Sequence, residues 1–103
     1  MIYDVLNNIV PTFYGRYPSD EENQPPEPPF ICYMGAGQET FDADNTFYYS
    51  QNEYTAEYYF LRKNEETEAA LEASLLANGY KYTKSDDIYI ESEDMYYIVY
   101  DIS

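Results

Sequence analysis

Aromatic residues decide whether this chain can fold at all, because it is otherwise dominated by charge. Twenty Asp and Glu stand against five Lys and Arg, and the formal net charge is −15. A chain with this much charge and few large apolar side chains would stay disordered. Here fifteen tyrosines and five phenylalanines supply large buriable areas and a strong preference for strands. We therefore expect residues 1–103 to form one folded domain rich in β-structure.

The clearest helix signal runs over residues 64–78. Asn64 can cap the N-terminus, an acidic first turn suits the helix dipole, and Gly79 follows Asn78 as a stop. Leu71 and Leu75 lie one turn apart, and we expect this face to pack on a sheet. The residues expected beside them on the same face are Ala70, Ala73 and Leu76.

Alternating apolar residues predict several strands. The clearest covers residues 53–61, with Tyr58 and Phe60 on one face and Tyr59 on the other. Aromatics on both faces indicate a sheet covered on both sides, by a helix on one and by a neighbouring subunit on the other. Another strand is expected at 39–41 and again at 46–49, with residues 42–45 as an irregular or turn-like interruption. The remaining strands are expected at 30–34, 88–91 and 95–102, and a turn at 92–94 joins the last two as a hairpin.

The remaining segments complete an α+β pattern. Residues 2–9 have the apolar spacing of a short helix, which Pro11 ends. Residues 12–17 are either a short strand or an extended arm, and 80–83 lead into the last strands. Residues 18–29, with five prolines, three Glu and one Asp, form a Pro- and acid-rich loop. The order α-β-β-β-α-β-β predicts a mainly antiparallel sheet packed by one main helix and one short N-terminal helix.

The residue types used most often in catalysis are missing or isolated. No histidine is present to act as a base near neutral pH, and Cys32 has no basic neighbour to activate its thiol. Gly35 and Gly37 precede a strand rather than a helix, so they do not form a phosphate-binding loop. We therefore predict that the chain is not an enzyme and has neither catalytic residues nor a cofactor.

Metal binding and export are also not expected. Residues 42–53 place oxygen-bearing side chains at the spacing of a calcium loop, but Phe47 occupies the position that requires glycine. Ordinary turns formed by Asp and Asn explain this segment better. Cys32, expected to be buried, cannot form a disulfide within the chain. No apolar run approaches the ~20 residues of a membrane span, and no basic start of a signal peptide is present. We expect assembly in a reducing cytoplasm.

The charge limits the partners as well. Binding to nucleic acid or to an anionic membrane requires clustered cations, and the five basic residues are scattered among carboxylates. We expect the repeated aromatics to pack in the core and between subunits, because tyrosine is enriched at protein interfaces. The acidic clusters are either solvated loops or mimics of phosphates. The residues predicted for the partner interface are Tyr48, Tyr49, Tyr59, Tyr97, Glu21 and Glu22.

Several segments together resemble a known family. They include Tyr14-Gly15, Pro28-Pro29-Phe30, Ala43-Asp44-Asn45, the strand at 54–60, Arg62-Lys63-Asn64-Glu65-Glu66-Thr67-Glu68 at the helix start, Gly79-Tyr80, and Tyr89-Ile90-Glu91-Ser92-Glu93-Asp94-Met95-Tyr96. This pattern of aromatic and turn residues covers nearly the whole chain and is similar to small tail-completion proteins, the tail terminators, of siphophages and prophages of Gram-positive hosts. The loop at 18–29 is longer and more acidic than in that pattern.

The resemblance implies a structural protein of the virion. Its subunits would close into a ring, expected to be a hexamer, that caps the tail tube at the head–tail junction and is assembled in the host cytoplasm. The implied partners are further copies of the chain, the major tail tube protein and a head-completion protein, with no cofactor. Carboxylates lining a DNA conduit would repel passing phosphates, and the loop at 18–29 would reach a neighbour or the tube.

Two other functions remain open on the same composition. An acidic inhibitor could occupy the nucleic-acid site of a host defence protein by charge mimicry, and such a protein should bind a basic partner in a salt-sensitive way. An adaptor elsewhere in the virion, such as a head-completion protein, is the other alternative.

Overall fold

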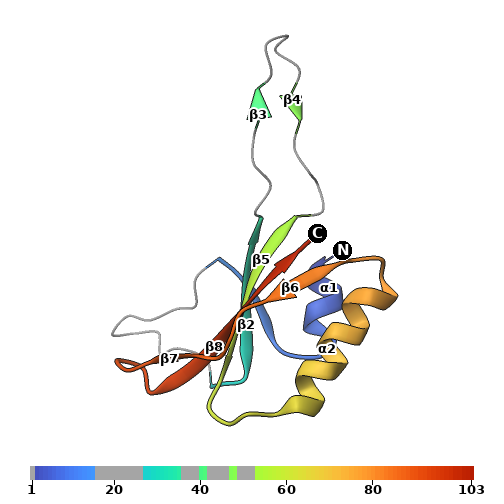
Figure 1. The fold of residues 1–103 in the computed structure, drawn as a ribbon. Helices are drawn as coiled ribbons and strands as arrows, with labels where there is room; N and C mark the ends of the chain where they lie inside the picture. The colour runs from blue at the N-terminus through green and yellow to red at the C-terminus, as the bar shows by residue number, and fades with distance from the viewer. Residues whose placement is uncertain (1, 16–26, 36–39, 42–46, 49–52) are drawn as a thin grey trace.

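The computed structural model describes residues 2–15, 27–35, 40–41, 47–48 and 53–103, which form an α+β fold (Figure 1). A six-stranded, mainly antiparallel sheet carries the two helices on one of its faces. The elements in chain order are α1 (Ile2–Asn7), β1 (Thr12–Tyr14), β2 (Phe30–Gly35), β3 (Thr40–Phe41), β4 (Phe47–Tyr48), β5 (Tyr54–Phe60), α2 (Glu65–Ala77), β6 (Tyr82–Lys84), β7 (Ile88–Ile90) and β8 (Met95–Ile102).

Strands β5 and β8 form the centre of the sheet. They pair antiparallel over seven residues, from Tyr54 opposite Ile102 to Phe60 opposite Tyr96. Strand β2 pairs antiparallel with β5, and β1 pairs parallel with β2 at one edge. At the other edge, β6 and β7 pair antiparallel with successive parts of β8. The predicted fold class, the element order and the β7–β8 hairpin are therefore confirmed.

The structure decides one open alternative and corrects two expectations. Residues 12–14 form a strand, β1, which confirms the strand rather than the extended arm in this part of the chain. Residues 82–84 are an edge strand, β6, rather than a lead-in. The strand expected at 39–41 and 46–49 is instead two short strands, β3 and β4, which pair with each other in a separate two-stranded sheet. The intervening residues 42–46 lie outside the described part of the chain.

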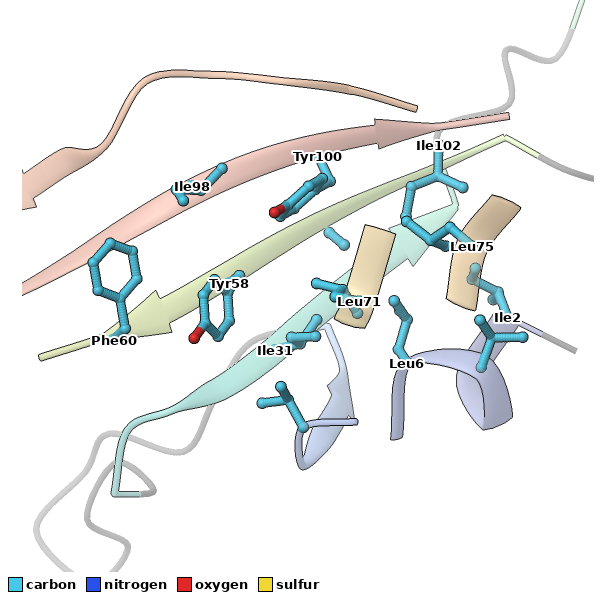
Figure 2. Close-up of a cluster of buried hydrophobic side chains, with 13 residues drawn as sticks. Ile2, Leu6, Ile31, Tyr58, Phe60, Leu71, Leu75, Ile98, Tyr100 and Ile102 are labelled. Atoms are coloured by element: carbon cyan, nitrogen blue, oxygen red, sulfur yellow. The ribbon is translucent and has the colours of Figure 1, made fainter. Parts of the chain in front are cut away.

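The main core lies between the helices and the sheet (Figure 2). Its largest fully buried side chains are Tyr58, from β5, and Tyr100, from β8, the two central strands. The cluster consists of Ile2, Val5, Leu6, Val10, Ile31, Ala56, Tyr58, Phe60, Leu71, Leu75, Ile98, Tyr100 and Ile102. The alternation predicted for β5 is confirmed, because Tyr58 and Phe60 face this core while Tyr59 belongs to a cluster on the other face.

The predicted buried face of α2 is only partly correct. Leu71 and Leu75 are buried, but Ala70, Ala73 and Leu76 are exposed, with Leu76 at 59%. Two glutamates complete this stripe, because Glu68 and Glu72 lie three or four residues from the leucines and share their face of the helix. Glu68 is 4% exposed and Glu72 is half-buried, and both are held by lysines from other segments.

Both predicted ends of α2 are confirmed in atomic detail. The Asn64 side-chain oxygen accepts a hydrogen bond of 3.1 Å from the Thr67 N–H. At the other end Gly79 has φ +85°, and the Tyr80 N–H donates to the Leu75 carbonyl at 2.9 Å. This left-handed residue satisfies carbonyls that the last turn would otherwise leave without partners, and it turns the chain toward β6.

We predict that Gly79→Ala lowers the free energy of unfolding by about 1 kcal/mol, because a Cβ atom is disfavoured at positive φ. The expected Cβ position meets no atom within 4 Å, so the cost comes from the backbone alone. Gly35→Ala is the matched control, since Gly35 also has open space but an ordinary φ. It should change stability by less than about 0.5 kcal/mol in the same urea titration. Equal effects of the two substitutions would contradict this account of the helix end.

Candidate functional site

Two of the predicted interface tyrosines lie together on the sheet face opposite the helices. Tyr59 stacks between Phe30, at a centroid distance of 4.8 Å, and Tyr97, at 5.5 Å. Together with Ile88, these residues form one row across β2, β5, β8 and β7. Phe30 is fully buried and Tyr59 is 7% exposed, whereas Ile88 is 37% exposed. Within the row, only the β7 end is therefore open to a partner.

The other predicted interface residues are not placed by the structure. Tyr48 lies in β4, but its side chain is outside the described part of the chain, as are Tyr49, Glu21 and Glu22. Most of the calcium-loop segment 42–53 is also outside the described residues. Within the described part of the chain, no group of three or more acidic or Cys side chains could hold a metal ion. The buried position expected for Cys32 is confirmed.

A surface that the sequence pattern did not reveal gathers five tyrosines at one end of the sheet, which we call the tyrosine patch. Its members are Tyr3, Tyr14, Tyr33, Tyr54 and Tyr80, and they come from α1, β1, β2, β5 and the segment after α2. Their rings form a continuous series of contacts through Tyr33 and Tyr54, with centroid distances from 5.3 to 6.5 Å. The patch is open to solvent, because Tyr14 is 71% exposed and Tyr3 is 39% exposed.

The electrostatic surroundings of the patch are negative. Burial, followed by the neighbouring tyrosines and Asp4, raises the pKa of Tyr33. Glu53, which immediately precedes β5, is exposed beside Tyr54. A groove of about 570 Å³ adjoins this end, and Glu53 and Asp101 outnumber its single cation, Lys81. Burial also raises the pKa of Tyr80, so the hydroxyl groups of Tyr33 and Tyr80 keep their protons at neutral pH beside these carboxylates.

A second open surface lies at the opposite end of β5, which we call the Arg62 groove. It is a hollow of about 480 Å³ with prolines and aromatic rings in its walls and cations at its rim. Leu61 is 54% exposed, and the Lys63 ammonium lies 5.7 Å from the centre of the Phe60 ring. The lining residues are Pro28, Pro29, Tyr58, Phe60, Leu61, Arg62, Lys63, Asn64 and Thr67.

Arg62 and Lys63 differ in their pairing. Lys63 contacts Glu68 and also donates to Asp87 at 3.0 Å, so its charge is compensated within the chain. Arg62 is exposed and makes no ion pair with any residue in the part of the chain that the structure describes. In a chain with twenty carboxylates, an arginine left in this state is available to a partner.

A partly buried ion network connects α2 to β6 and to the segment before the helix. The Lys63 ammonium lies 3.0 Å from Oε1 of Glu68 and 2.8 Å from Oε2, and only the contact with Oε1 has hydrogen-bond geometry. The Lys84 ammonium lies 3.4 Å from Glu68 and 2.8 Å from Glu72. Hydrogen bonding to Glu68, opposed by partial burial, raises the pKa of Lys63, and bonding to Glu72, opposed in the same way, raises the pKa of Lys84.

Glu72 is the most highly bonded carboxylate of this network. It accepts hydrogen bonds from Lys84 at 2.8 Å, from the Tyr100 hydroxyl at 2.8 Å and from the Tyr82 hydroxyl at 3.1 Å. Burial alone would raise the pKa of Glu72, but these bonds and the Lys84 charge outweigh it and lower the pKa. Both lysines stay charged and both carboxylates are engaged, so the network fits a structural role better than acid–base catalysis.

Comparisons with protein-family models, with curated protein sequences and with solved structures found no match to this chain. Among the described residues, neither helix has the length and apolar character needed to cross a bilayer.

We predict that Glu72→Gln lowers the free energy of unfolding at pH 7 by about 2 kcal/mol, because charged hydrogen bonds become neutral ones in a partly buried site. A carboxyl group whose pKa is lowered by folding contributes stability above its unfolded value, here 4.5, and loses it as the pH falls through the folded value. The difference between wild type and variant should therefore shrink below pH 4.5, as measured by urea titrations from pH 7 to pH 2.5.

Glu93→Gln is the control for that experiment, because Glu93 is exposed in the β7–β8 turn and the substitution changes the net charge equally. It should leave the unfolding free energy nearly unchanged at every pH. A Glu72→Gln effect that is independent of pH would contradict the assigned role of the carboxylate charge.

Proposed function

We propose that this chain is a tail terminator, a structural phage protein that forms an oligomeric ring, caps the tail tube and joins it to the head connector. The resemblance of its aromatic and turn residues to that family first suggests this function. The observation that supports it best is the tyrosine patch, in which two exposed and three half-buried tyrosines gather from five segments, because tyrosine is enriched at protein–protein contact surfaces.

The chemistry of the patch explains why it suits a permanent contact. Tyrosine rings provide contact area at low cost in side-chain entropy, and their hydroxyl groups find hydrogen-bond partners across an interface. The rings of Tyr33, Tyr54 and Tyr80 pack against the core and are held in place, while Tyr3 and Tyr14 project further into solvent. A rigid platform of this kind is preorganised for binding.

The acidic surface fits the same function. Most of the described Asp and Glu side chains are exposed, including those of the β7–β8 turn, Glu91, Glu93 and Asp94. Carboxylates within roughly 8–10 Å of a DNA duplex repel its phosphates at physiological salt. A ring around the DNA path would use this repulsion to let the genome pass without sticking. The same exposed turn would serve the alternative function, an acidic inhibitor that mimics nucleic acid.

The expected result is a ring or a stable complex when the purified chain is measured by light scattering after gel filtration, alone and mixed with the major tail tube protein of the same genome. The mixture is needed because a terminator can remain monomeric until the tube is present. A chain that stays monomeric in both samples and binds a basic host nuclease in a salt-sensitive way would contradict the proposal and favour the inhibitor.

We predict that Tyr14→Ser abolishes or weakens the assembly at least tenfold while leaving the fold intact, because this ring is mostly exposed. Leu76→Ala is the matched control. Leu76 is a large exposed apolar residue of α2 and is not a member of the patch. If both substitutions weaken assembly equally, the tyrosine patch is not the contact surface.

A further inference from the structure

We propose that the Arg62 groove of one copy binds the tyrosine patch of a second copy, so that the subunits join head to tail with Arg62 facing the carboxylate of Glu53. The inference rests on the proposed oligomer and names the two surfaces that build it. Neither surface alone defines a partner, but their positions and charges are complementary.

The two surfaces lie at opposite ends of one rigid strand. Tyr54 begins β5 and Phe60 ends it, and both side chains pack on the helix-bearing side of the sheet. Six residues along a strand span roughly 20 Å. Contact between different patches at opposite ends of a subunit is heterologous, and such contacts generate closed rings when the rotation between subunits closes.

The charges distinguish this arrangement from a symmetric dimer. The groove carries Arg62 and Lys63, whereas the patch is bordered by Asp4 and Glu53. Pairing two grooves would bring two Arg62 side chains together, and pairing two patches would bring together acidic ends in which carboxylates outnumber Lys81. Close like charges at an interface cost several kcal/mol. The opposite pairing, groove to patch, gives Arg62 an acidic partner that it lacks within the described part of its own subunit.

The apolar groups of the two surfaces also match. The groove presents Pro28, Pro29 and the exposed Leu61 around its aromatic wall, and the patch presents the rings of Tyr3 and Tyr14. Aromatic side chains inserted between prolines and aliphatic groups are typical anchors of an interface, and flanking ion pairs set its register and specificity. A copy of this chain is the occupant favoured here, because it supplies both the aromatic and the acidic components.

The experiment exchanges the charges of the proposed pair. Arg62→Glu and Glu53→Arg are each expected to lose self-association by at least about tenfold, because each places like charges at every contact. An equimolar mixture of the two variants should recover assembly, with the variants alternating. In the mixture the groove of each variant faces an oppositely charged patch on the other. The double variant should also assemble alone. Assembly is measured by light scattering, with the tail tube protein added if the wild type requires it.

Asp86→Arg is the control for charge, because Asp86 is exposed between β6 and β7 and the substitution changes the net charge as Glu53→Arg does. It should assemble like the wild type. Both substituted side chains of the test are exposed, so thermal unfolding midpoints should stay close to that of the wild type.

The possible results test the groove-to-patch contact and the proposed function separately. Single variants that assemble normally, or a mixture that fails to recover, would overturn the groove-to-patch contact while leaving a wild-type ring intact. A wild-type chain that forms no oligomer, with or without the tube protein, would overturn the proposed function and this inference together.

Discussion

The neutralisation of two carboxylates on the buried side of α2 is the condition on which the helix-to-sheet packing depends. Glu68 and Glu72 share a helical stripe with Leu71 and Leu75, so the helix cannot bury its leucines without also bringing both acids toward the core. An unpaired buried carboxylate costs several kcal/mol. Lys63 and Lys84 remove most of that cost by approaching from both sides, and the Tyr82 and Tyr100 hydroxyls complete the bonding of Glu72. Replacing one of these lysines would leave a carboxylate on the buried side of α2 without its charged partner.

Because the network uses lysines to neutralise Glu68 and Glu72, few cations remain for the surface. The described part of the chain contains four cations, and the network engages two of them inside the subunit. Arg62 and Lys81 make no ion pair with described residues, and they lie at opposite ends of the sheet. A protein with a net charge of −15 therefore has very few positions at which it can attract an acidic surface. Arg62 lies in a hollow lined by prolines and aromatic rings, so it is better placed than Lys81 to bind an acidic surface.

The local elements of this fold were predictable from the sequence, because each depends on neighbouring residues. Asn64 and Gly79 fix the ends of α2, and the alternation of Tyr58, Tyr59 and Phe60 fixes the two faces of β5. The buried face of α2 was not predictable in the same way. A hydrophobic pattern assigns glutamates to solvent, and only contacts with lysines distant in sequence, such as Lys84, reverse that assignment.

The interaction surfaces were less predictable still, because they are created by topology. Tyr14 and Tyr33 are in contact because β1 pairs parallel with β2. The sequence of the short segment 12–14 does not indicate which strand it pairs with. Tyr59 and Tyr97 were predicted as residues of a partner interface. Their rings stack on one face of the sheet, and their row is buried at the Phe30 end.

Long-range repulsion between acidic subunits acts at distances up to roughly the Debye length, about 8 Å at physiological salt. At shorter range the nature of the contacting side chains decides whether two copies stay together. Tyrosine is well suited to that task, because it adds contact area and hydrogen-bonding capacity without adding charge. In the proposed ring, the carboxylates would face the DNA path, and the subunits would associate through aromatic rings and a few well-placed cations. The concentration of tyrosines at one end of the sheet, and of Arg62 beside aromatic and proline walls at the other, satisfies both requirements within a single small domain.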